Sequence, residues 1–315
     1  MKGSAKSVRL KYLLYAFCAF ALVTLPLRVY QLLTMVESET GFYSKTDFSV
    51  GVYFVLLALF AAGSMYFSYI SAEVPSSKLG GGKNRVLGAS SAILGVGLLC
   101  DIVGSAYSLV KSVSETGSVL GLTQSVSAQG GVITIIRIAA AFLGAVYLFV
   151  MAVSHFNGRA SYREYKVLAL MPLLWTMCRM VGRLTIAISY VKVSELLLEI
   201  AMLVFLMLFF MNFARVTSGV SAKGNMWGIF GFGLPAVLLA LNISLPRLVV
   251  LLSGNSCVKD YAFNFADFAL AVFIFVYILA ALGAFYSEPV REKTVHELMP
   301  ELPSEADGQT EEQGL

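Results

Sequence analysis

Long, almost uninterrupted runs of apolar residues dominate the pattern along this chain. Eight of them approach the roughly 20 residues that a helix needs to cross the hydrocarbon core of a bilayer. They are too long and too uniformly apolar for the alternating ten-residue strands of a membrane β-barrel. Backbone groups in lipid must be hydrogen-bonded internally, so helices remain. The predicted membrane helices cover residues 12–33, 50–72, 86–110, 132–156, 167–191, 196–214, 226–252 and 262–285.

Composition points to the same class of protein. The chain has 315 residues, of which 58% are hydrophobic and only 13% charged, and its mean hydropathy is +0.78. A soluble domain is about 45–50% apolar and about 25% charged. A water-soluble enzyme, a disordered chain and a disulfide-rich secreted scaffold are therefore excluded. We predict an all-α polytopic membrane protein in which residues 1–287 form a transmembrane helical bundle.

The distribution of lysine and arginine predicts the orientation. Fourteen of the 23 bases lie near the two ends of the chain and in the even-numbered connections, whereas four lie in the odd-numbered connections. By the positive-inside rule both termini are cytoplasmic. Eight helices with short connections give four helical hairpins in a multi-pass protein of the cell membrane. The basic start also suits a signal peptide, but its apolar run is long and no small-residue cleavage site follows, so we expect a retained helix.

The last segment has the opposite charge. Residues 288–315 hold eight acids and two bases, a net charge of −6. Because the whole chain has a net charge of +4, the remaining residues carry a net charge of +10. This stretch has no hydrophobic periodicity. We predict an acidic, disordered cytoplasmic tail that offers a contact for a cytoplasmic partner.

Nine ionisable residues lie within or just inside the predicted membrane helices, and all fall in the outer half of the membrane. Each costs about 2.5–3.5 kcal/mol at a helix centre unless it is paired or wetted. Antiparallel neighbours at equal distance from a turn lie at similar depth. Three hairpins can therefore each close one intramembrane ion pair, Asp101 with Arg137, Arg183 with Glu199, and Arg247 with Asp267; the other three residues are Arg28, Arg179 and Glu195.

Arg28 has no acid in its own hairpin, so its partner must come from elsewhere in the protein or from a ligand. A guanidinium binds carboxylate or phosphate with two parallel hydrogen bonds. We therefore interpret Arg28, Arg179 and Arg183 as contacts for an anionic organic solute or lipid headgroup in an outward-facing, Arg-rich cavity. The function that follows is a permease, whose acids hold the arginines or carry a coupled proton. The alternative for each charge is a structural clamp or a side chain that reaches the interface.

Two other classes stay open. An intramembrane enzyme that acts on a lipid-linked phosphate or acyl group would use Asp101 or Glu199 as its base, and we favour it less because no histidine lies near them. A non-catalytic sensor or assembly subunit would use the acidic tail. No cofactor, metal site or nucleic-acid partner is predicted, because His155 and His296 lack ligands at metal-binding spacing and residues 80–83 lack the context of a P-loop.

The seventh predicted helix contains three glycines and two prolines, which favours either a break that binds solute or ordinary packing. Near its outer end, residues 245–247 (Leu-Pro-Arg) resemble residues 25–28 (Leu-Pro-Leu-Arg) of the first helix. This match is short enough to arise by chance, so an internal repeat and a chance match are equally good interpretations. We interpret Trp175 and Trp227 as packing or interface residues rather than as residues that stack on a ligand.

Overall fold

The computed structural model describes residues 3–37, 43, 48–71, 83–116, 131–158, 161–185, 193–219, 226–254 and 262–283. This part of the chain is all-α, and its one β-bridge joins Val36 to Tyr43. The predicted tail, residues 288–315, lies outside it. The helices are α1 (Gly3–Thr34), α2 (Phe48–Ile70), α3 (Arg85–Thr116), α5 (Gly131–Asn157), the short 3-10 helices η2 (Ser161–Glu164) and η3 (Leu168–Leu170), α6 (Met171–Thr185), α7 (Val193–Thr217), α8 (Met226–Leu252) and α9 (Phe265–Ala281).

Helix length divides the predicted spans into two groups. In the described ranges six helices, α1, α2, α3, α5, α7 and α8, are long and apolar enough to cross a membrane, so the chain is a multi-pass integral membrane protein. Helix α9 is apolar but has 17 residues, and α6 has 15. At 1.5 Å per residue α6 is about 22 Å long, less than the roughly 30 Å of a hydrocarbon core. The crossings predicted over 167–191 and 262–285 therefore stay predictions.

Local sequence signals set several helix boundaries. Helix α6 begins one residue before Pro172, which needs no hydrogen-bond acceptor in a first turn. The side chain of Asn264 accepts a hydrogen bond from Ala266 N at 3.0 Å and caps α9. Four helices end at a glycine in the left-handed conformation, where a side chain would be strained: Gly158, Gly219, Gly254 and Gly283.

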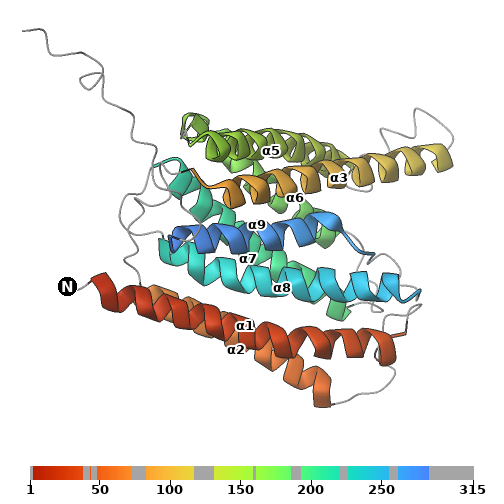
Figure 1. Cartoon of the computed structure of the whole chain (residues 1–315). Helices are drawn as coiled ribbons and strands as arrows, with labels where there is room; N and C mark the ends of the chain where they lie inside the picture. Colours follow the sequence, from red (N-terminus) through yellow and green to blue (C-terminus); the bar gives the residue numbers. More distant parts are fainter. Residues whose placement is uncertain are drawn as a thin grey trace, which may run out of the picture.

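Six helices form a closed ring, and the first two pack outside it. Helices that are consecutive in the chain contact each other in four pairs: α1 with α2, α3 with α5, α6 with α7, and α8 with α9. The pairs are joined by contacts of α7 with α8, α9 with α3, and α5 with α6. Helices α1 and α2 both pack on α8 and lie at one side of the molecule, as Figure 1 shows. Helix α8 is therefore shared by the ring and the α1–α2 pair.

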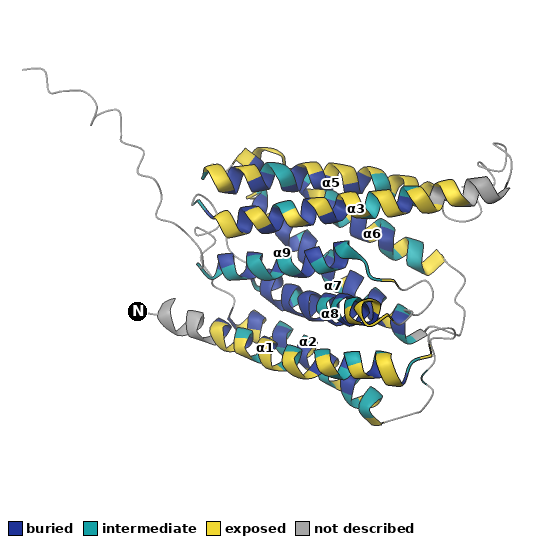
Figure 2. Ribbon diagram, turned by 45° about the vertical axis from the view of Figure 1, so that its right-hand side comes forward, coloured by how far each residue is buried: buried dark blue, intermediate teal, exposed yellow. Residues whose placement is uncertain are grey.

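Burial follows this arrangement. In an 18-residue apolar stretch of α8, 72% of the residues are buried, against 22% in the corresponding stretches of α1 and of α2. Figure 2 shows buried residues gathered on α7, α8 and α9 and exposed ones along the outer sides of α1, α3 and α5. The exposed side chains include large apolar ones, such as Leu22 (76%) and Val103 (68%). An apolar exterior of this extent suits a lipid environment rather than water.

Helix α8 runs without a break, although Pro235 and Pro246 lie inside it. Its glycines allow close packing: a Cβ on Gly228 would lie 2.6 Å from Cγ of the Asn212 side chain. We expect Gly228→Ala to destabilise the fold by about 1–3 kcal/mol, since Asn212 must move. Thermal unfolding in detergent micelles measures this. The control is Gly63→Ala in α2, where the added methyl meets nothing within 4 Å; equal unfolding temperatures would contradict the contact.

Candidate functional site

The nine charged residues predicted to lie inside the membrane gather in one layer at the end of the bundle where α7 and α9 begin and α1, α6 and α8 end. Three of these residues lie in the terminal turn of their helix: Glu195 in the first turn of α7, Asp267 in the first turn of α9, and Arg183 in the last turn of α6. Acids at helix N-termini and bases at C-termini complement the helix dipole. The helix ends therefore help to hold this layer of alternating charge, which we call the charged layer.

Arg179 is the centre of the first of three groups in the layer. Its guanidinium is 5% exposed and binds both carboxylate oxygens of Asp267, with 2.9 Å from Nη2 to Oδ2. The same Nη2 lies 3.0 Å from Oε1 of Glu199, and Nε of Arg183 lies 3.1 Å from that oxygen. Two arginines of α6 thus meet one acid from α7 and one from α9. This group is electrically balanced.

Glu195 is the centre of the second group. Its Oε2 accepts a hydrogen bond from Nη2 of Arg247 at 2.7 Å, and its Oε1 accepts one from Arg28. Arg28 also donates to the hydroxyl of Tyr43 at 2.7 Å and lies 5.5 Å from the ring centroid of Tyr53 in α2. One carboxylate therefore holds two guanidiniums, from α1 and α8. We call these three residues the Glu195 group.

The third group lies at the side of the bundle. Asp101 of α3 accepts a hydrogen bond from Trp175 Nε1 at 2.9 Å and lies 3.6 Å from Nε of Arg137 in α5. Arg137 also donates to Ser105, and 25% of its side chain is exposed. Trp175, Arg179 and Arg183 follow one another at four-residue spacing on one face of α6. Trp175 therefore connects the third group to Arg179, a role that the interpretation of this residue as a packing or interface residue missed.

The structure brings together two of the three ion pairs expected inside hairpins, Asp101 with Arg137 and Arg183 with Glu199. The contacts of the last hairpin run elsewhere: Arg247 binds Glu195, and both oxygens of Asp267 bind Arg179. The reason is that α7 contacts both α6 and α8, so its acids compete with those of α9 for the nearby arginines.

The partner of Arg28, which the sequence left undefined, is Glu195 of the third hairpin. Arg28 and Arg247 belong to the two similar Leu-Pro segments and meet on the same carboxylate. All three members of the Glu195 group are at most 5% exposed. In this conformation the guanidiniums are enclosed rather than open to the outside, so a cavity at this place requires the helices to separate.

Several buried polar atoms near the layer have no hydrogen-bond partner. They include Oε2 of Glu199, the hydroxyl of Tyr53 beside Arg28, and Oδ1 of Asn242 in α8. The amide nitrogen of Asn242 donates to Thr24, one turn before Arg28 in α1. Buried groups of this kind are rare in native proteins and call for an explanation.

Metal ligation and family membership add no further assignment. In the described part of the chain, no three side chains of His, Cys, Asp or Glu lie together as metal ligands would. Comparison with protein-family models, with curated proteins and with solved structures finds no match to this chain.

Proposed function

We propose that this protein is a permease of the cell membrane that binds an anionic organic solute in the charged layer. The observation that carries the proposal is the Glu195 group, in which one buried carboxylate is shared by guanidiniums from two helices. A solute carboxylate or phosphate offers the same oxygens to the same donors. Glu195 then acts as an internal substitute for the solute.

The substitution explains how a buried site can open. Separating Arg28 from Glu195 without replacement leaves buried charge uncompensated, at a cost of roughly 3–5 kcal/mol. An anionic solute that takes the place of the carboxylate offsets this cost, so helix separation and solute binding are coupled. Because α1 and α2 contact the rest of the bundle mainly through α8, movement of this pair is the simplest way to expose Arg28.

The unpartnered atoms support a polar solute rather than a bare ion. Tyr53 OH and Asn242 Oδ1 lie on helices that contact α1 or α8, and each leaves hydrogen-bonding capacity unused. A solute with hydroxyl or amine groups would satisfy them. The nine charges contain five arginines and four acids, so the layer itself has a formal excess of one positive charge. This excess favours an anion.

The proposal includes the membrane topology. All eight helices cross the membrane as four hairpins, with both termini in the cytoplasm. The charged layer then lies in the outer half of the bilayer, because 14 of 23 bases occupy the opposite side.

One observation favours an intramembrane enzyme as the second candidate. Glu199 keeps one oxygen without a partner, as a general base would. Asp101, in contrast, is engaged by Trp175 and Arg137. Such an enzyme would convert lipid-linked phosphates or acyl groups without moving a solute across the membrane.

The test is uptake by proteoliposomes, combined with thermal unfolding in the presence of organic carboxylates, organic phosphates and neutral analogues. We expect anions alone to stabilise the protein and at least one to be accumulated. Arg28→Met should lose this stabilisation, whereas Arg137→Met, in the third group, should keep it. Stabilisation of Arg28→Met equal to that of the unmodified protein would contradict the proposal, and product formation without uptake would favour the enzyme.

A further inference from the structure

A second charged feature lies at the opposite end of the bundle from the charged layer. It is a groove of about 400 Å³ between the segment before α6 and the last turns of α7. We call it the basic groove, and its lining residues are Lys166, Val167, Leu170, Met211, Ala214, Arg215 and Ser218. Neither the permease proposal nor the ion pairs use any of these residues.

The groove combines two chemistries. Lys166 and Arg215 are both exposed, and the described lining residues include no acid. Val167 is 67% exposed and Leu170 is 45% exposed, so the wall of the groove presents apolar surface at the bundle exterior. Free inorganic anions match the two bases but gain nothing from the apolar wall. An anionic lipid matches both, because its phosphate and its acyl chain are adjacent.

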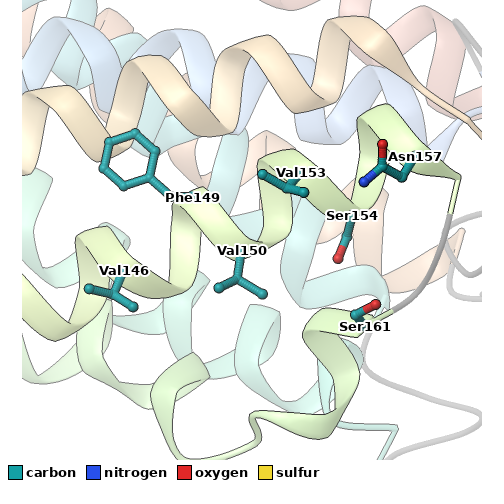
Figure 3. Close-up of a pocket in the computed structure, with 7 residues that line it drawn as sticks. All are labelled: Val146, Phe149, Val150, Val153, Ser154, Asn157 and Ser161. Carbon is teal, nitrogen blue, oxygen red and sulfur yellow. The ribbon is translucent and has the colours of Figure 1, made fainter.

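A neighbouring groove shows what the bases add. It has a volume of about 440 Å³, and Figure 3 shows its lining of valines, Phe149 and polar residues along α5, with Ser161 of η2 close to Ser154 at one end. None of the described residues that line it is charged. The two grooves flank the same segment, residues 161–170, and have similar size. Their difference in charge predicts that only the basic groove selects an anionic headgroup.

We propose that the basic groove is a binding site for an anionic phospholipid of the leaflet that borders this end of the bundle. Lys166 and Arg215 bind the phosphate, the hydroxyl of Ser218 donates to it, and Val167, Leu170 and Met211 contact the acyl chain. With both termini in the cytoplasm, this leaflet is the cytoplasmic one. The site is independent of the solute site in the charged layer.

The test measures binding of short-chain phosphatidylglycerol to the purified full-length protein by native mass spectrometry. The probes for comparison are phosphatidylcholine of equal chain length and glycerol phosphate, which has no acyl chain. We expect a clear preference for phosphatidylglycerol over both. The double variant Lys166→Gln/Arg215→Gln should bind it roughly 30-fold more weakly, as expected for two interfacial bases.

The matched control removes two bases of the same end of the bundle that do not line the groove, Lys83→Gln/Arg85→Gln. This variant should retain the preference, and Leu170→Glu should lose it because an acid then faces the phosphate. Equal losses in the two double variants would overturn the proposal, as would equal binding of glycerol phosphate. If phosphatidylglycerol binds only after residues 297–315 are deleted, the groove belongs to the acidic tail and the lipid proposal is wrong.

Discussion

Replacing Glu195 with alanine is expected to destabilise the protein by about 3–5 kcal/mol and to make its stability depend on added carboxylate. The substitution leaves the guanidiniums of Arg28 and Arg247 beside each other without the acid that they share. It also creates space the size of a small carboxylate. Formate or acetate can enter that space and restore the lost hydrogen bonds, so we expect these anions to raise the unfolding temperature of the variant.

The measurement is thermal unfolding in detergent at constant ionic strength, with chloride replaced stepwise by formate or acetate. Asp101→Ala is the control, since its acid lies in the third group, where Arg137 retains Ser105 and some access to solvent. Two results would show that the Glu195 carboxylate does not stabilise the two arginines. One is an unfolding temperature of Glu195→Ala equal to that of the unmodified protein, and the other is an equal response of the variant to chloride and formate.

Replacing Arg179 with alanine is expected to have a comparably large effect, about 3–5 kcal/mol, for the opposite reason. Here two carboxylates lose their shared base: both oxygens of Asp267 and one of Glu199 bind the Arg179 guanidinium. Arg179→Lys should rescue little, because an ammonium cannot present the planar fork that binds Asp267 through two oxygens. The free energy of unfolding in mild denaturant measures both variants.

Arg183→Ala is the matched control for Arg179→Ala, on the same helix one turn later. The Arg183 side chain is 28% exposed, and Glu199 keeps Arg179 as a partner when Arg183 is removed. We expect the control to cost about 1 kcal/mol or less. Equal losses in the two variants would contradict the central position of Arg179.

Much of the fold could be predicted because lipid imposes strong local constraints. Six of the eight predicted spans correspond to described helices of membrane-crossing length, and three of these six end at a glycine in the left-handed conformation. The other two are shorter, since α6 begins beside Pro172 and α9 is capped by Asn264. Apolar run length predicts that a segment is membrane-embedded, but it does not show where the helix itself begins.

The residues of the candidate site were easier to predict than the ion pairs that they form with one another. Equal depth within a hairpin correctly predicted two ion pairs, Asp101 with Arg137 and Arg183 with Glu199, because the two helices of each hairpin pack against each other. It assigned Arg247 to Asp267, whereas the structure places Arg247 on Glu195. Three aromatic residues also contact charges of the layer, namely Tyr43, Tyr53 and Trp175. No spacing in the sequence predicted these contacts.

Sequence alone established a multi-pass helical protein with nine charges inside its apolar segments, because apolar length and charge are properties of each segment taken by itself. The tertiary structure decided which charges meet. Arg28 and Glu195 are 167 positions apart, and they pair only because α1 packs on α8 while α8 packs on α7. Helix packing in a membrane depends on side-chain fit over long sequence separations, which no local pattern records. The charge that lacked a partner in its own hairpin is thus one of the three members of the Glu195 group.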